Sequence, residues 1–168
     1  MEALREIHVA LATYPGRLPS FTVAIDSCRR LLQEGTALPA LPARDKDFLL
    51  VEHDRLRMLL AAAAVTPVPV HGDPHLGNVL ITSSGPLWTD WEPACVGPLE
   101  WDHSCLPGTS AVSPIVDQEM LALLRDLRSV CVAVWCWADP DRAPEKREAA
   151  EFHLHRLRER SRSARRSA

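Results

Sequence analysis

The amino-acid sequence predicts a mainly α-helical fold with one small antiparallel β-hairpin, which places it in the α+β class. Two observations lead to this prediction. Apolar residues recur at helical spacing before residue 65 and again after residue 98. Between these two regions the apolar runs are short, and turn-forming residues separate them. The expected order is therefore helices, a hairpin and then more helices.

The composition is that of one soluble globular domain. Of the 168 residues, 46% are hydrophobic and 24% are charged, which is enough apolar surface for a single core. We expect this domain to occupy residues 1–160, and we expect the basic residues 161–168 to form a disordered tail. The apolar runs at 59–65 and 130–138 are shorter than the roughly 20 residues of a membrane span. No membrane partner is therefore expected.

Cysteine usage and the first residues of the chain indicate a cytoplasmic protein. The five cysteines contain no CxxC pair, which fits reduced, mostly buried thiols better than a disulfide framework or a zinc site. The first segment is acidic and amphipathic, whereas a secretion signal starts with cationic residues and continues with an apolar stretch.

Three helices are expected before the hairpin, over residues 2–12, 22–34 and 44–64. One face of the first carries Leu4, Ile7, His8 and Leu11. Gly35 follows the second as a C-terminal stop, and a proline-containing linker leads from there to the third. The third helix has an apolar stripe and an alanine-rich end.

Short apolar runs at residues 68–71, 79–82 and 87–91 predict β-strands. The last two runs flank Ser-Ser-Gly-Pro at residues 83–86, a composition typical of a hairpin turn. The segment GDPHLG, residues 72–77, separates the first two and is rich in residues that tolerate unusual backbone angles. We therefore expect its polar side chains on a loop between strands.

The chain is expected to return to helix after the hairpin. A loose helix is predicted around residues 99–106. A long apolar helix should follow over residues 114–137, with Ser113 as N-cap and Pro114 at the first helical position. A last helix should run from residue 144 to about residue 160 and fray into the arginine-rich end.

The segments HGDPHLGNVL, residues 71–80, and TDWEPACVGPLEWD, residues 89–102, carry the polar residues that suggest chemistry. The predicted strands bring together Asp73 on the loop, Asn78 at the start of one strand and Asp90 at the end of its hairpin partner. Phosphoryl transfer needs one carboxylate to meet the attacking hydroxyl. It also needs hard oxygen ligands for Mg²⁺, a task that a second carboxylate and an amide oxygen can fulfil.

The pattern H-G-D-x-H-x-x-N-x-L, followed by an aspartate on the next strand, resembles the signature of the aminoglycoside phosphotransferase and choline kinase family, which shares the protein kinase fold. The resemblance implies that Asp73 is the catalytic base. It implies that Asn78 and Asp90 bind Mg²⁺ and, through it, the phosphates of ATP or GTP. Structural support of the site would come from His71, His75 and Asp102.

These residues also have structural interpretations. Asp73 could form an Asx turn, and Asn78 could cap that turn. The apolar neighbours of Asp90 in the segment LWTDW favour a buried position over a surface strand. Glu92 either tunes the metal or faces solvent, and the sequence favours neither.

A second chemical interpretation is a metal-dependent hydrolase. His71, Asp73 and His75 match an H-x-D-x-H pattern that such enzymes use to bind zinc or paired metals. This alternative requires further ligands. The remaining histidines lie on predicted helices without an HExxH or similar spacing, so it stays a remote one.

Two features of the resembled family are not found in the sequence. The seven glycines form no GxG loop, and the two lysines, Lys46 and Lys146, lie on predicted helices. The resemblance therefore implies a C-terminal catalytic lobe without its N-terminal lobe. Positioning supplies about 7–11 kcal/mol of a barrier, so such a lobe alone should turn over nucleotide slowly or not at all. The alternative is a non-catalytic ligand-binding or interaction module. An exposed apolar patch would favour self-association or an N-terminal-lobe partner.

Charge bears on the substrate. The net charge of −3 combines an acidic body with residues 156–168, which hold six arginines and one acid. An acidic body suits a cationic hydroxyl substrate, aminoglycoside-like or choline-like, and a sugar-like acceptor is the alternative. The charge alone fits an ordinary solvated surface equally well. The arginine-rich end has no interleaved aromatic residues, so no nucleic-acid partner is expected.

Overall fold

The structure, a computed structural model, describes residues 2–34, 38, 41–83, 85–106, 116–138 and 143–166. The chain forms two compact units, and each is built from two separate chain segments. The first unit comprises Met1–Val23 and Ala63–Arg125, and the second comprises Ala24–Ala62 and Asp126–Ala168. The composition of the chain gave no sign of this division.

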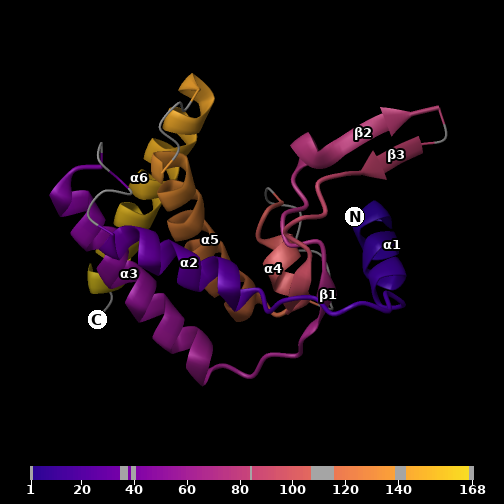
Figure 1. Cartoon of the computed structure of the whole chain (residues 1–168). Coiled ribbons are helices and arrows are strands. Elements are labelled where there is room, and N and C mark those ends of the chain that lie inside the picture. The colour runs from indigo at the N-terminus through magenta and orange to yellow at the C-terminus, as the bar shows by residue number, and fades with distance from the viewer. Residues whose placement is uncertain are drawn as a thin grey trace. The chain divides into compact units, whose positions relative to one another are not determined.

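The first unit contains two small antiparallel sheets, and the β2–β3 sheet extends away from the rest of that unit (Figure 1). Strand β1 (Val68–Val70) pairs with β4 (Cys95–Gly97), and β2 (Val79–Thr82) pairs with β3 (Gly85–Trp88). The chain before α2 extends the first sheet, because the N–H of Phe21 donates to the carbonyl of Val96 at 3.0 Å. The hairpin expected from the sequence is the second of these sheets.

Helices cover the β1–β4 sheet of the first unit. Both α1 (Glu2–Leu11) and α4 (Leu99–His103) pack against β1. Phe21 and Trp101 are buried and lie with ring centroids 5.5 Å apart. The buried side chains of this unit include Leu4, Ile7, Val70, Cys95 and Leu121. This packing fixes the point at which β1 ends and the polar loop begins.

The second unit is helical. It consists of most of α2 (Thr22–Gln33), α3 (Ala43–Ala62), the second half of α5 (Gln118–Ala138) and α6 (Pro144–Arg166). Apolar side chains at helical spacing form its core: Ile25, Cys28, Leu32, Leu49, Leu56, Leu127, Cys131, Val134, Leu154 and Leu157. Among the described helices, none is both long and apolar enough to cross a membrane. All five cysteines are thiols, as the sequence led us to expect.

The main difference from the predicted helices is the start of α5. The helix begins at Gln118, and Asp117 is its N-cap, because the Asp117 carboxylate accepts from the N–H groups of Glu119 and Met120 at 2.8 and 3.0 Å. The predicted start at residue 114 was wrong. The predicted cap, Ser113, lies outside the described residues.

Three smaller differences concern other elements. The second hairpin strand is Gly85–Trp88 rather than 87–91, since the pairing begins with Thr82 and Gly85 and ends at Trp88. Strand β4 was not predicted, because three residues between an alanine and a proline give too little pattern. Helix α6 continues to Arg166, past the expected end near residue 160, in keeping with the good helix propensity of arginine and alanine.

Candidate active site

The loop that follows β1 is held by the carboxylate of Asp102, a residue of α4. This carboxylate is fully buried. Its Oδ2 accepts from the N–H of His71 at 2.9 Å, and its Oδ1 accepts from the N–H of Gly72 at 2.8 Å. Bonds to an ionised acceptor are the stronger kind. Asp102 therefore fixes the direction in which the chain leaves β1.

Gly72 brings this loop into backbone contact with the segment that follows β3. Its φ of 89° lies in the region that favours glycine, and a Cβ at this position would collide with the carbonyl oxygen of Pro93. No other residue type satisfies both conditions without moving the backbone. The glycine of the H-G-D motif therefore lets the two segments approach each other.

A closed circuit of hydrogen bonds joins the same two segments. The ring of His71 accepts from the N–H of Asp73 through Nδ1 at 3.4 Å and reaches the carbonyl of Thr89 through Nε2 at 3.1 Å. Thr89 donates its N–H to the carbonyl of Asn78 at 2.9 Å. The amide of Asn78 donates to the carbonyl of Asp73 at 3.0 Å, which closes the circuit. Thr89, the residue before Asp90, is thus bonded both to the start of the loop at His71 and to its end at Asn78.

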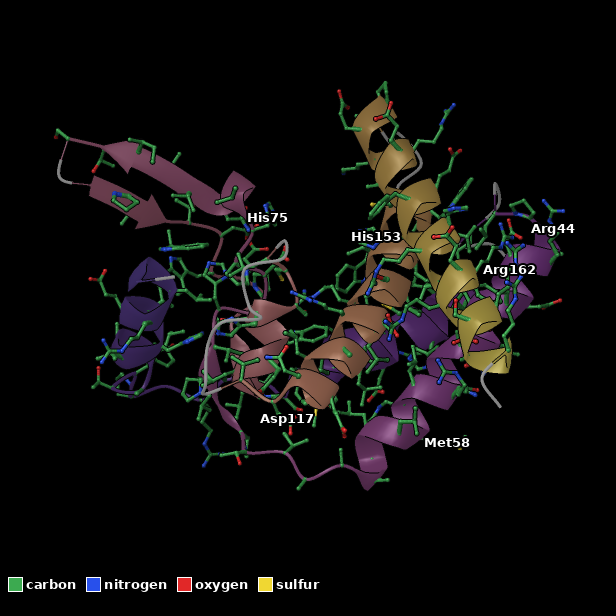
Figure 2. The ribbon with its side chains drawn as sticks, turned by 180° about the vertical axis from the view of Figure 1, so that it is seen from behind. Arg44, Met58, His75, Asp117, His153 and Arg162 are labelled. Atoms are coloured by element: carbon green, nitrogen blue, oxygen red, sulfur yellow. The ribbon has the colours of Figure 1, made fainter. Side chains whose placement is uncertain are left out.

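Asp73 lies on the accessible side of this circuit, with its side chain 34% exposed. Its Oδ1 accepts from the thiol of Cys105 at 3.5 Å. Its Oδ2 lies 3.6 Å from Nε2 of His75, which Figure 2 labels at the base of the β2–β3 hairpin. His75 accepts from the N–H of Gly77 through Nδ1, so its proton is on Nε2 and faces Asp73. A hydroxyl group from solvent can therefore reach the Asp73 carboxylate.

Asp90 lies just beyond β3, in an unusual backbone conformation. Its φ is 59°, and it is the one non-glycine residue with positive φ in the described part of the chain. Aspartate tolerates this left-handed region better than most residues, and such outliers cluster at functional sites. Asp90 is exposed, so the buried position expected from its apolar neighbours was wrong. Of those neighbours, Leu87 and Trp91 are exposed as well.

Asn78 and Asp90 carry oxygen donors of the type that a hard cation prefers. The Asn78 side chain is nearly buried, and its amide nitrogen is used in the bond to Asp73, so its Oδ1 is the remaining acceptor. Asp90 contributes carboxylate oxygens, and it has no hydrogen bond or ion pair with other described residues. Mg²⁺ is typically bound by one or two protein oxygens together with phosphates and water. These two side chains match that requirement.

The geometry does not suit the H-x-D-x-H alternative. Both ring nitrogens of His71 are engaged with the backbone, at Asp73 and Thr89, and the ring is fully buried. Within the ranges that the structure describes, no three histidine, cysteine, aspartate or glutamate side chains are grouped closely enough to hold a metal ion. His71 thus links the loop after β1 to the segment after β3 through its two ring nitrogens.

Sequence reasoning missed several residues of this site. Thr89, Pro93 and Cys105 contribute through backbone atoms or a single thiol contact, and no pattern in the sequence marks them. His8 left a signal, because it is a polar residue on the otherwise apolar face of the first helix. Its Nε2 lies 2.8 Å from Oδ2 of Asp102. The neighbouring His103 has its pKa lowered, first by burial and then by the proximity of His8.

Comparisons with known proteins agree with this geometry at the level of the fold. A choline kinase, LicA from Streptococcus pneumoniae, has a TM-score of 0.69 at 18% identity over 94% of this chain and 61% of that chain. LicA in complex with AMP gives 0.66 at 15% identity, with the same coverage of 94% and 61%. A choline/ethanolamine kinase family protein from Mesorhizobium loti gives 0.64 at 18% identity over 91% and 59%.

The chain thus spans about three fifths of the length of these solved structures, 61% of the first and 59% of the third. No match was found among curated protein sequences. A family model, described as the phosphotransferase enzyme family, matches residues 2–160. Because that model covers nearly the whole chain, and because the neighbours share its mainly α-helical lobe, the resemblance first seen in the H-G-D motif is confirmed: this chain belongs to the phosphotransferase enzyme family.

Proposed function

We propose that this chain carries the phosphoryl-transfer site of a small-molecule kinase, which moves the γ-phosphoryl group of ATP or GTP to a hydroxyl group. The observation that carries the proposal is the hydrogen-bond circuit through His71, Asp73, Asn78 and Thr89. The circuit ties the loop that carries the partly exposed Asp73 to Asn78 and to Thr89, the residue that precedes the exposed Asp90. Catalysis of phosphoryl transfer consists mostly of such positioning and charge stabilisation.

Asp73 is the proposed catalytic base. The acceptor hydroxyl oxygen forms a bond to the γ-phosphorus, the bond between that phosphorus and the bridging oxygen breaks, and the hydroxyl proton moves to a carboxylate oxygen of Asp73. The contacts of Asp73 with Cys105 and His75 hold its side chain while leaving it accessible. General base catalysis of this kind contributes typically about 10²- to 10⁴-fold.

Asn78 and Asp90 are the proposed Mg²⁺ ligands, through Oδ1 of the amide and the exposed carboxylate. When bound, the cation neutralises charge on the phosphate oxygens of the nucleotide. The chain's own contribution is to fix the two ligands. The carbonyl of Asn78 accepts from both the N–H and the hydroxyl of Thr89, at 2.9 and 3.2 Å, and Thr89 directly precedes Asp90. The spacing between the ligands is therefore set largely by backbone bonds.

The acceptor is a small hydroxyl compound. The named neighbours are a choline kinase and a choline/ethanolamine kinase family protein, which favours a cationic alcohol for this chain as well. The net charge of −3 agrees with a cationic substrate. Aminoglycoside-like and sugar-like alcohols are the remaining acceptor classes to be compared.

The first test is calorimetric titration with Mg-ATP and Mg-GTP. Asp90→Asn is the informative variant, because asparagine keeps the tolerance for positive φ while the charge is removed. We expect nucleotide affinity to fall by about tenfold or more. Asp47→Asn, an exposed carboxylate on α3, is the matched control and should bind as the parent does. Equal affinity in all three proteins would exclude Asp90 as a metal ligand.

The second test separates a kinase from a non-catalytic binding module. The release of the nucleoside diphosphate, ADP or GDP, is measured with three classes of acceptor: choline, an aminoglycoside and a sugar. A kinase should respond to one acceptor class and lose turnover in Asp73→Asn while retaining nucleotide binding. Because a lobe alone should turn over slowly, release is followed over long incubations with Asp73→Asn as the background. Nucleotide binding with release equal to that background for every acceptor favours a binding module instead.

A further inference from the structure

The ring of His8, on helix α1, reaches the buried carboxylate of Asp102. Its Nε2 lies 2.8 Å from Oδ2, and the two residues are separated by 94 positions in the sequence. A carboxylate accepts hydrogen bonds, so Nε2 is the donor. The same Oδ2 accepts from the N–H of His71 at 2.9 Å. One oxygen atom therefore joins helix α1 to the first amide of the candidate catalytic loop.

The hydrogen bond between His8 and Asp102 matters for stability because the carboxylate is buried. The Asp102 side chain has no exposure to solvent, and a buried carboxylate is costly unless its lone pairs are occupied. The amides of His71 and Gly72 occupy one position on each oxygen, and His8 supplies a further donor. Without His8, Oδ2 would lose the ring that holds it against the loop, and the carboxylate could turn about its Cβ–Cγ bond.

Helix α1 reaches the loop by a second route as well. Leu4 and Ile7 are buried on the same face as His8, and α1 packs against β1, which ends one residue before His71. The side chain of His8 is 14% exposed, so it is mostly covered in the first unit. A shift of α1 would therefore move both the strand that enters the loop and the carboxylate that holds its amides.

We propose that His8 is a positioning residue for the catalytic loop, acting through Asp102 so that the placement of α1 sets the backbone of residues 71–73. The part of this proposal that concerns catalysis rests on the proposed function. The part that concerns the loop backbone does not, and it can be tested in the absence of nucleotide or substrate.

The experiment is hydrogen exchange measured on the peptide that contains the amides of His71 and Gly72. His8→Leu removes the donor and places an apolar residue with good helix propensity on the buried face. We expect exchange at these amides to speed up by about tenfold or more, the effect of losing one hydrogen bond to a charged group. His8→Gln retains an N–H donor and should restore part of the protection. Val9→Ala, an exposed change on the same helix, should leave the loop unchanged.

Amides outside the loop separate positioning from general loss of stability. In His8→Leu, exchange at the α3 amides of the second unit should stay within about twofold of the parent. If the variant does not fold, the decision falls to His8→Gln, whose loop protection should lie closer to that of the parent than to that of unfolded chain. Parent-like loop exchange in folded His8→Leu, or loop exchange in His8→Gln as fast as in the unfolded chain, would overturn the proposal.

A kinetic readout then addresses catalysis. If the chain is active as proposed, His8→Leu should lower kcat by about tenfold while the KM for nucleotide changes little, because His8 contacts neither of the proposed metal ligands. Changed loop exchange in a parent that binds no Mg-nucleotide would count against the proposed function and would leave the structural coupling in place. An unchanged kcat in an active protein whose loop exchange has increased would overturn the catalytic part alone.

Discussion

The carbonyl oxygen of Asn78 accepts two hydrogen bonds from Thr89, one from its N–H at 2.9 Å and one from its hydroxyl at 3.2 Å. Asn78 and the residue after Thr89 are the two proposed metal ligands. The contact therefore links them through a short stretch of backbone, independently of any ion. It makes Thr89 the first residue to test.

Thr89→Val removes the hydroxyl donor and keeps the branched shape and the N–H bond. A hydrogen bond of this kind contributes about 1 kcal/mol, so we expect Mg-nucleotide affinity to fall by about fivefold. Thr82→Val is the matched control, because Thr82 donates its hydroxyl to the carbonyl of Gly85 at the far end of the same hairpin. Calorimetry that shows the same small effect in both variants would contradict a role of Thr89 in spacing the ligands.

Gly72→Ala tests the close approach of the loop to Pro93. Alanine would combine a disfavoured φ of 89° with a collision against a backbone carbonyl, so we expect a loss of about 3 kcal/mol in the free energy of unfolding. Gly85→Ala also imposes positive φ, at 116°, but its Cβ would meet nothing within 4 Å. It should cost about 1–2 kcal/mol. Urea unfolding of both variants measures the difference. Equal losses would show that the close approach to Pro93 does not affect the free energy of unfolding.

Asp117→Ala should shorten or loosen the start of α5. The carboxylate accepts from two N–H groups of the first turn, and loss of such a cap costs about 1 kcal/mol of stability. Asp117→Asn keeps an acceptor oxygen and should recover most of that loss. The measurement is thermal unfolding followed by circular dichroism. Identical melting of the alanine variant and the parent would contradict Asp117 as the cap.

His153 makes stability depend on pH. Its pKa is lowered to about 4, chiefly by burial and then by the nearby charge of Arg156, against an ordinary value of 6.5. Between these values the unfolded chain binds a proton that the folded chain does not, so stability is complete above about pH 6.5 and falls as the pH drops toward 4. Allowing for partial exposure of the ring, we expect a loss of about 2 kcal/mol.

Urea unfolding at pH 7 and pH 4.5 measures this loss. His153→Gln should reduce the difference between the two pH values, because the titrating group is removed. A parent-like pH difference in His153→Gln would assign the effect to other groups.

The sequence predicted the parts of the fold that local pattern determines. Helical spacing of apolar residues located the helices, and turn chemistry located the hairpin, so the mainly α-helical class with a small antiparallel sheet is confirmed. The H-G-D motif led to the family in the same way. The roles assigned to Asp73, Asn78 and Asp90 stay predictions.

Long-range contacts decided what the sequence could not. We expected Ser113 as the N-cap of this helix, whereas the cap is Asp117, whose N–H donates to Oε1 of Glu100, at 2.8 Å, on another helix. Asp90 is exposed because β3 stops at Trp88 and the chain then turns through a positive φ. Neither event leaves a local pattern, since both depend on residues that meet only in the folded chain.

The interleaving of the two units has a consequence for synthesis on the ribosome. The first unit is complete in sequence once Arg125 has been translated, whereas the second needs the segment from Asp126 onward to cover α2 and α3. The apolar faces of those two helices therefore lack these partners until that segment has been synthesised. Nascent chains that end at Arg125 should bind chaperones more strongly than chains whose α6 has left the ribosome, because exposed apolar surface makes incompletely folded chains prone to aggregation.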